Sequence, residues 1–253
     1  MIRAIMHGAS GHMGAVVTDI CREDSDIEIV AGVALEAGEG PGYTIYSSLE
    51  DVKEQADVII DFSGAPAVDA LLDYMESRGV PAVICTTGLS EEQVARIDEV
   101  SQKTAILRSA NMSLGINTLM ELLKKATDVF VPAGFDVEIV EKHHNQKLDA
   151  PSGTAIALAD SVNEAAGDAF EYVYDRSQVR RKRDKKELGI SAVRAGTIVG
   201  EHDVIFAGTD EVITFTHTAY SKAIFAKGAV SAAKFLAGKD KGLYDMADVI
   251  RAS

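Results

Sequence analysis

The stretch HGASGHMG (residues 7–14) decides the fold, because it joins an apolar run at 2–7 to an amphipathic run at 12–22. The apolar run predicts a buried strand and the amphipathic run predicts a helix. Glycines at the spacing GxxGxxG permit a tight turn, close approach of a pyrophosphate to the backbone, and close packing of helix on strand. The first N–H groups of such a helix lack intrahelical acceptors and favour an anion. We therefore expect the first unit of a dinucleotide-binding domain, and a purely structural turn is the alternative.

Glu36 supports the dinucleotide interpretation. It lies 22 residues after Gly14 and follows a second predicted strand at 27–35. An acidic side chain about 20 residues after the glycines is what a ribose diol requires. The same carboxylate would repel a 2′-phosphate, and the following residues Ala37-Gly38-Glu39 supply no cation. NADH is therefore expected to bind at least as well as NADPH.

Two different patterns divide the chain near residue 111. In the first part, strands are predicted at 2–7, 27–35, 57–62, 81–86 and 104–107, and helices at 12–22, 65–78 and 91–102. This alternation predicts right-handed βαβ units and a parallel sheet. The second part has predicted helices at 114–129, 151–166, 224–237 and 244–251, a strand at 135–142, and three alternating segments between 190 and 218. Period-two alternation predicts half-buried strands. The fold class is therefore α/β, with a Rossmann-like parallel-sheet nucleotide domain and an α+β domain that has a mixed or antiparallel sheet.

Composition excludes several classes of protein. The 253 residues are 47% hydrophobic and 25% charged, which are ordinary values for globular domains and disfavour intrinsic disorder of the chain as a whole. The net charge of −14 disfavours nucleic acid as a partner. Cys21 and Cys85 form neither a disulfide framework nor a zinc-binding spacing, which favours a reduced cytoplasmic compartment. We expect no signal peptide and no membrane span, because no apolar run is long enough.

The segment HHNQKLDAPSGTA (residues 143–155) is the densest chemical cluster. His143 and His144 follow the predicted strand at 135–142, and Lys147 comes four residues after His143. Proline in the first turn, with serine or aspartate as the cap, then starts a helix. Its first N–H groups, expected to stay free, belong to Ser152, Gly153 and Thr154. With Lys147 they predict a carboxylate or phosphate site, next to a histidine that can transfer protons near neutral pH. A metal-binding pair and a purely structural pair are the alternatives for the histidines, but the spacing does not suit zinc.

The segment EKHHNQKLDAPSGTA closely resembles the signature of the 4-hydroxy-tetrahydrodipicolinate (dihydrodipicolinate) reductase family. GASGHMG, IDFSGAP, CTTGLSEEQ, SANMSLGIN, RAGTIVGEHDVIF and GLYDMADVI resemble further segments of the family in family order, so the resemblance covers almost the whole chain. It implies NAD(P)H-dependent reduction of 4-hydroxy-tetrahydrodipicolinate to tetrahydrodipicolinate with loss of water, in the diaminopimelate route to lysine. It also implies a small dicarboxylate substrate and a homotetramer that pairs the sheets of the substrate domain.

The resemblance implies roles for individual residues. His143 matches the acid/base histidine, and Lys147 matches the lysine that donates a proton. The matching substrate-binding positions are His144, Ser152, Gly153 and Thr154. The matching cofactor-binding positions are Gly8, Ala9, Ser10, Gly11, His12, Met13, Glu36, Cys85, Thr86, Thr87, Ser109, Ala110, Asn111 and Met112. The implied domains are 1–112 with 222–253 for the dinucleotide, and 113–221 for substrate binding and oligomerisation.

Two positions depart from the family pattern. Cys85 stands where the family often has glycine, which would narrow the nicotinamide pocket, and Ala37 stands where some members have arginine. The basic run RSQVRRKRDKK (residues 176–186) predicts a solvated, mobile loop, with a subunit or anionic-partner contact as the alternative. Asp61 is expected to cap the turn after its strand.

Two other classes of function fit parts of this pattern. A two-domain dehydrogenase for a sugar or semialdehyde would share the nucleotide domain, but it gives no reason for the histidines, Lys147 and the helix start together. A non-catalytic dinucleotide sensor would need no proton donor and would bind NADH without turnover.

Overall fold

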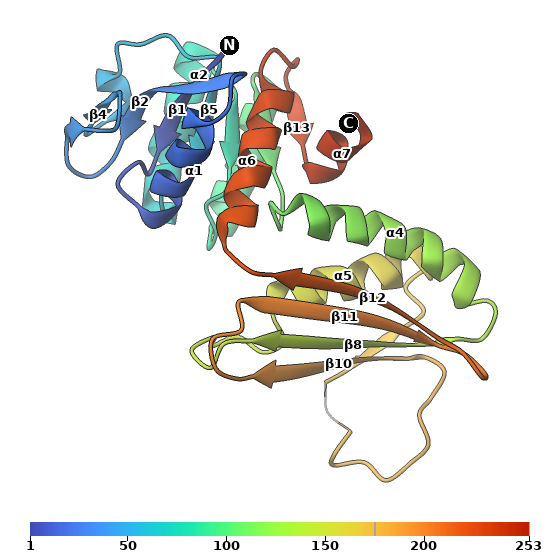
Figure 1. Cartoon of the computed structure of the whole chain (residues 1–253). Helices are drawn as coiled ribbons and strands as arrows, with labels where there is room; N and C mark the ends of the chain where they lie inside the picture. Colours follow the sequence, from blue (N-terminus) through green and yellow to red (C-terminus); the bar gives the residue numbers. More distant parts are fainter. Residues whose placement is uncertain (175, 253) are drawn as a thin grey trace. The chain divides into compact units, whose positions relative to one another are not determined.

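The computed structural model describes residues 1–174 and 176–252, and it forms two compact units (Figure 1). Unit 1 comprises Met1–Leu114 together with the segment from Ala223 onward, and unit 2 comprises Gly115–Lys222. These limits lie within two residues of the boundaries that the resemblance implied.

Unit 1 is built on one eight-stranded sheet with the order β13-β7-β6-β5-β1-β2-β4-β3. Its strands are β1 (Ile2–His7), β2 (Ile27–Val33), β3 (Gly38–Glu39), β4 (Thr44–Tyr46), β5 (Val58–Asp61), β6 (Ala82–Ile84), β7 (Ala105–Arg108) and β13 (Gly242–Tyr244). The neighbouring strands pair in parallel, except for the antiparallel pair of β3 and β4. The predicted parallel sheet is therefore confirmed. Every residue of β5 and β6 is buried, as in strands covered on both faces.

Helices cover both faces of this sheet. They are α1 (His12–Arg22), α2 (Ala65–Arg78), α3 (Glu91–Ser101), α6 (Ala223–Leu236), α7 (Met246–Ala252) and the short 3₁₀ helix η1 (Leu49–Asp51). Successive residues of β1 point to opposite faces, so Met6 packs in a core with α1 and α6, whereas Ile5 packs in a core with α2 and α3. Gly79, in the left-handed conformation, ends α2, and a capping box between Ser90 and Gln93 starts α3.

Unit 2 pairs two helices with a five-stranded mixed sheet. The helices are α4 (Leu114–Phe130) and α5 (Gly153–Ala165), and the strands are β8 (Asp136–His143), β9 (Glu171–Val173), β10 (Glu187–Arg194), β11 (Gly200–Ala207) and β12 (Val212–Ala219). The strand order is β12-β11-β8-β10-β9, with β10 parallel to β8 and β9, and β11 antiparallel to β8 and β12. This confirms the mixed alternative.

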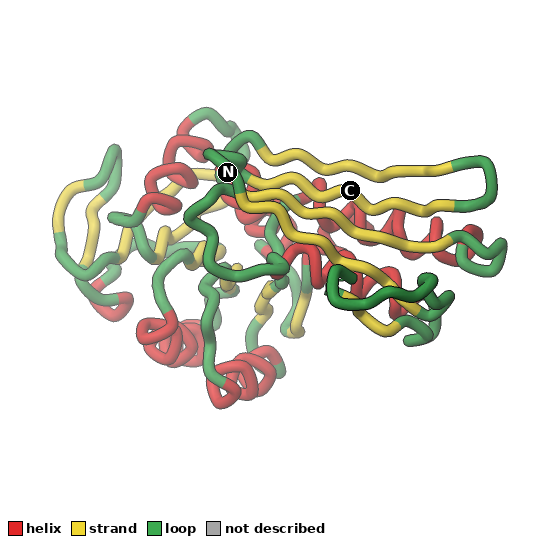
Figure 2. The backbone as a smooth tube through the Cα atoms, turned by 90° about the horizontal axis from the view of Figure 1, so that it is seen from below, coloured by secondary structure: helices red, strands yellow, loops and turns green. Residues whose placement is uncertain are grey.

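One face of the unit 2 sheet carries the core. Burial alternates along β8 and β11, and the inward residues Ile139, Val204 and Phe206 pack against Leu123 of α4 and Leu158 of α5. Both helices lie over this face, and neither described helix of unit 2 covers the opposite face (Figures 1 and 2). The sheet is therefore open on one side.

The structure corrects several predicted elements. Strands β3, β4, β9 and β13 have two or three residues each and were not predicted, because so short a run shows no period. The predicted helix at 244–251 begins instead at Met246, since Tyr244 pairs with Leu107 at the edge of the sheet. Strand β10 begins at Glu187, three residues before the first predicted position.

Candidate functional site

The loop between β1 and α1 forms a cradle that side chains cannot fill. Gly8 has a φ of +89°, and a Cβ there would lie 2.5 Å from the Phe62 carbonyl oxygen. A Cβ at Gly14 would overlap the Gly8 carbonyl oxygen. Gly11 is the residue before α1, and it makes no side-chain capping hydrogen bond. The first N–H groups of α1 therefore have no hydrogen-bond acceptor within the helix. The cradle fits the pyrophosphate of a dinucleotide.

The other positions predicted to bind the cofactor lie at one edge of the unit 1 sheet. Glu36 follows β2, Cys85 to Thr87 follow β6, and Ser109 to Met112 follow β7. Because these strands are parallel to β1, the segments after them lie at the same edge as the glycine loop, where α/β sheets bind ligands. Glu36 is exposed, whereas Thr86, Asn111 and Met112 are buried. Burial raises the pKa of the Cys85 thiol, which keeps it neutral.

Asp61, at the end of β5, does more than cap a turn. Its Oδ1 accepts hydrogen bonds from the Ser63 backbone N–H (3.1 Å) and hydroxyl (2.6 Å), and its Oδ2 accepts one from the Thr86 hydroxyl (2.7 Å). His7 Nδ1 lies 2.9 Å from Oδ1. Burial favours the neutral acid, but these partners prevail and lower the pKa of Asp61. The carboxylate thus ties the loop after β6 to the end of β1.

In unit 2, a buried carboxylate holds His143. Glu141 and His143 lie two residues apart on β8 and therefore share its inner face. His143 Nδ1 is 2.6 Å from Oε2 of Glu141, whose side chain is fully buried. Arg194, at the end of β10, donates from Nη1 to Oε2 and from Nη2 to Oε1, both at 2.7 Å. The Ser152 N–H donates to Oε1 at 3.0 Å. Burial favours the neutral acid, but these hydrogen bonds lower the pKa of Glu141, so the group is ionised.

The N–H groups of Ser152 and Gly153 at the start of α5 are engaged, which corrects the expectation that they stay free. Ser152 donates to Glu141, and Gly153 donates to the carboxylate of Asp149. Carboxylates of the protein itself therefore lie at the N-terminus of α5, where the positive end of the helix dipole stabilises negative charge. The Ser152 hydroxyl caps the helix by accepting from the Ala155 N–H at 3.2 Å, so serine is the one used of the two predicted caps. Pro151 precedes this cap, which corrects the prediction that it lies in the first turn.

Lys147 lies in the turn after β8, close to this helix start. Its N–H donates to the His144 carbonyl, and its Nζ is 2.8 Å from Oδ1 of Asp149. The hydrogen bond from Lys147 is the largest of the effects that lower the pKa of Asp149. The structure thus brings Lys147, Gly153 and Asp149 together in one cluster, and His143, Ser152 and Glu141 in another. His144 is half-buried and follows His143 directly.

A second buried histidine completes the inner face. His202 on β11 lies across from Glu141, and its Nε2 is 3.1 Å from the Ser152 hydroxyl. Its ring meets that of His143 edge-on at 5.2 Å. Burial, reinforced by the charge of His143, lowers the pKa of His202 to about 4. His202 is therefore neutral near pH 7.

Sequence reasoning missed Glu141, Arg194 and His202. A local signal existed only for Glu141, because a glutamate two residues before a strand histidine must share its face. Arg194 and His202 are brought in by the pairing of β10 and β11 with β8. No group of three or more metal-binding side chains occurs among the described residues.

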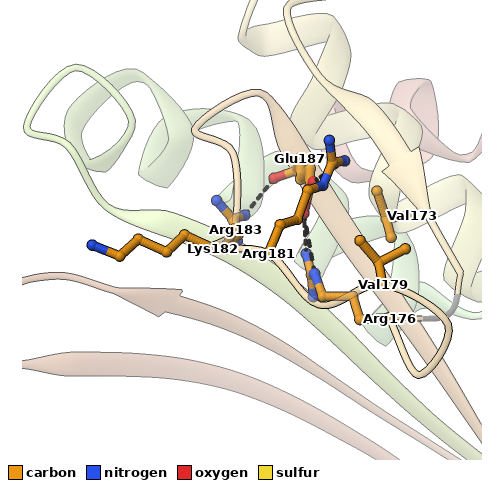
Figure 3. Close-up of a pocket in the computed structure, with 7 residues that line it drawn as sticks. All are labelled: Val173, Arg176, Val179, Arg181, Lys182, Arg183 and Glu187. Atoms are coloured by element: carbon orange, nitrogen blue, oxygen red, sulfur yellow. Dashed lines mark hydrogen bonds and ion pairs between the residues drawn. The ribbon is translucent and has the colours of Figure 1, made fainter.

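The basic segment is largely exposed to solvent, as expected, but three of its arginines also pair with carboxylates of the unit 2 sheet. Arg176 and Arg181 pair with Glu187 (Figure 3). Arg183 pairs with Glu138 at 2.9 Å. Glu187 is almost fully buried and requires such partners. These arginines therefore neutralise carboxylates of β8 and β10.

Among the described residues, none of the helices combines the length and the apolar character that a membrane span requires.

The neutral, buried His202 predicts that stability depends on pH. The pKa of His202 falls from an ordinary 6.5 to about 4 on folding, so between these values the unfolded chain binds a proton that the folded chain does not. The free energy of unfolding should decrease as the pH falls through this range, by about 3 kcal/mol in all. Urea unfolding between pH 7 and pH 4 measures this slope, and His202→Gln should flatten it. The exposed His12 supplies the control variant His12→Gln, which should keep the wild-type slope; equal slopes in wild type and His202→Gln would contradict the assignment.

Comparisons with known proteins agree with this arrangement. The family model for the N-terminus of dihydrodipicolinate reductase matches residues 2–112, and the model for its C-terminus matches residues 115–250. A 4-hydroxy-tetrahydrodipicolinate reductase of Caldanaerobacter subterraneus subsp. tengcongensis is 52% identical over 252 residues, which cover 99% of both chains. The enzyme of that name from Clostridium tetani is 43% identical over 246 residues, covering 97% of this chain and 96% of the relative.

A solved structure shows the same fold. The dipicolinate-bound dihydrodipicolinate reductase from Paenisporosarcina sp. TG-14 superposes with a TM-score of 0.80 and 25% identity, covering 97% of each chain. Both halves of this chain therefore match one family in sequence, and the whole chain matches it in fold. The protein belongs to the dihydrodipicolinate reductase family of oxidoreductases.

Proposed function

We propose that the protein reduces 4-hydroxy-tetrahydrodipicolinate to tetrahydrodipicolinate with NAD(P)H and loss of water, in the diaminopimelate route to lysine. The observation that carries this proposal is the cluster around the start of α5, where a histidine, a lysine and helix N–H groups meet. Relatives up to 52% identical over almost the whole chain bear the name of this activity. The dipicolinate in the Paenisporosarcina structure is a small dicarboxylate, which supports a dicarboxylate substrate.

The glycine cradle and the sheet edge beside it are the proposed cofactor site. Residues Gly8 to Met13 hold the pyrophosphate, Glu36 binds the ribose, and the loops after β6 and β7 contact the nicotinamide. When bound, NAD(P)H supplies the hydride that the reduction requires. Asp61 holds the Thr86 hydroxyl and thereby fixes the loop after β6.

The proposed substrate site is the start of α5 with the turn that holds Lys147. A substrate carboxylate takes the place of the Asp149 carboxylate, which is 57% exposed and so can turn into solvent. Lys147 and the Gly153 N–H then pair with the substrate, with His144, Ser152 and Thr154 around it. Glu141 occupies Nδ1 of His143, so Nε2 is the nitrogen that can exchange a proton. His143 acts as the acid/base group, and Lys147 donates the proton that follows hydride addition to the ring.

Unit 1 is proposed to bind the dinucleotide, and unit 2 to bind substrate and form a cytoplasmic homotetramer through its open sheet face. Val140 and Ile205 are half-buried on this face, beside the threonines of β12. Light scattering should give four times the chain mass of 26.9 kDa, and Ile205→Glu should lower the mass. A wild-type protein with the mass of one chain would contradict the tetramer.

Activity is tested by the loss of nicotinamide absorbance with the fresh condensation product of pyruvate and aspartate semialdehyde. The wild type should oxidise the cofactor, whereas His143→Ala and Lys147→Ala should each lose about 10²- to 10⁴-fold in kcat, because a positioned proton donor is removed. Both should bind NADH normally. Lys185→Ala, which removes an exposed lysine paired with Asp136, is the charge-matched control and should retain turnover. Wild-type turnover in both site variants would refute the residue roles, and a wild type without oxidation would refute the activity.

Glu36 should set the cofactor preference toward NADH. Its carboxylate would lie near the 2′-phosphate of NADPH with no cation in Ala37, Gly38 or Glu39 to offset the repulsion. Ala37→Arg should lower the KM for NADPH by about tenfold, corresponding to about 1.4 kcal/mol, and should leave the KM for NADH nearly unchanged. Glu39→Ala is the matched control for loss of a neighbouring charge. A wild-type KM for NADPH far below that for NADH would show that Glu36 does not exclude the phosphate.

A further inference from the structure

Glu141 is a fully buried carboxylate at the centre of the unit 2 site. Each of its oxygens accepts two hydrogen bonds. Oε2 is bound by His143 Nδ1 and Arg194 Nη1, and Oε1 is bound by Arg194 Nη2 and the Ser152 N–H. The donors come from the end of β8, the end of β10 and the start of α5. One side chain therefore joins three segments of the candidate site.

The contact with His143 has a chemical consequence. An ionised carboxylate only accepts hydrogen bonds, so Nδ1 of His143 must carry a proton. In the neutral ring the lone pair then lies on Nε2, and on protonation Nε2 becomes the donor that faces away from Glu141. A Cβ at Gly200 would lie 3.1 Å from Nε2, so the absence of a side chain there leaves room beside this nitrogen. Glu141 thus determines which nitrogen of His143 is available for chemistry.

Arg194 fixes the carboxylate itself. Its guanidinium binds both oxygens in the planar two-pronged geometry, which lysine cannot reproduce. Nη2 of Arg194 also donates to the backbone carbonyl of Asp149, in the loop that carries Lys147. The register of the sheet places Arg194 directly beside His143, so β8 and β10 hold this ion pair from both sides.

We propose that Glu141, held by Arg194, is the positioning residue that sets the tautomer and orientation of His143. It also fixes the position of the His143 ring relative to the start of α5 and the loop that carries Lys147. This inference rests on the proposed function, because it assigns a task to the proposed acid/base histidine. Glu141 does not touch substrate in this assignment and acts through His143.

A purely structural ion pair would affect stability alone, and the same sheet offers a matched control for that case. Glu187, at the opposite end of β10, is also a buried glutamate bound by two arginines, Arg176 and Arg181. It lies seven residues from Arg194 along the strand and contacts none of the proposed site residues in the described structure. Glu187→Gln therefore removes a similar interaction outside the site.

The experiment compares Glu141→Gln, His143→Ala, the double variant and Glu187→Gln in the full-length protein. Glu141→Gln should lower kcat by about 10- to 10³-fold, less than or equal to the loss in His143→Ala, while the KM for NADH stays unchanged. Added to His143→Ala, it should cause little further loss, because its effect passes through the missing ring. Glu187→Gln should lose stability but keep the wild-type kcat.

Imidazole ¹⁵N spectra of histidine-labelled protein give a readout that does not depend on turnover. In the neutral ring, observed at a pH above its titration, the wild-type His143 signal, assigned by its loss in His143→Ala, should show a proton-bearing Nδ1 and a bare Nε2, and Glu141→Gln should change this pattern. A folded Glu141→Gln with wild-type kcat, losses that add fully in the double variant, or an unchanged ¹⁵N pattern would each overturn the proposal. Should Glu141→Gln fail to fold, Arg194→Lys is measured instead, with a reduced kcat expected and an unchanged kcat overturning the proposal. A wild type inactive on the substrate refutes the proposed function, whereas the spectra still decide the role of Glu141.

Discussion

A buried carboxylate must be compensated on all sides, and the unit 2 site is organised by that requirement at Glu141. Removing such a charge from water costs several kcal/mol unless hydrogen bonds and an opposite charge replace the solvent. Glu141 obtains them from Arg194, His143 and Ser152, which lie on different segments. Those segments can adopt only the geometry that satisfies the carboxylate. The position of the proposed acid/base histidine relative to the start of α5 therefore follows from the electrostatics of a group that has no need to touch the substrate.

A buried carboxylate also organises the candidate cofactor site of unit 1. Asp61 is fully buried where β5 ends, and its partners are His7, Ser63 and Thr86. Two of these flank the glycine loop and the loop after β6, so one carboxylate holds both. Gly8 must approach the Phe62 backbone closely for this to occur, which a side chain at position 8 would prevent. Two of the acidic residues that contribute to the net charge of −14, Asp61 and Glu141, are thus buried, and their hydrogen-bond partners fix the geometry of the two candidate sites.

Local patterns were sufficient for much of this structure. Spacing and periodicity indicate the parallel sheet of unit 1, the mixed sheet of unit 2 and the glycine turn, and they leave serine and aspartate as the two candidate caps of α5. Arg194 lies 53 residues from Glu141, and nothing in the local sequence indicates that they pair. The same limitation explains the error at α5, where a helix start considered alone has free N–H groups, whereas the folded chain brings Glu141 and Asp149 to them. It also explains the basic segment, because strand pairing brings Glu138 and Glu187 next to its arginines.

The two carboxylates at the start of α5 differ in how firmly they are held, and this difference suits a site for an anion. The pair of Lys147 and Asp149 is largely exposed on the aspartate side, and exposed pairs contribute only about 0 to 1 kcal/mol. Breaking a buried pair by removing one partner costs about 3 to 5 kcal/mol, so Glu141 cannot give up its place. In the proposed site, an incoming carboxylate can therefore replace Asp149 at small cost while Glu141 keeps the proposed acid/base histidine fixed. An acidic protein can bind an acidic substrate in this way, because the positive groups of the site are already assembled around a carboxylate that can leave.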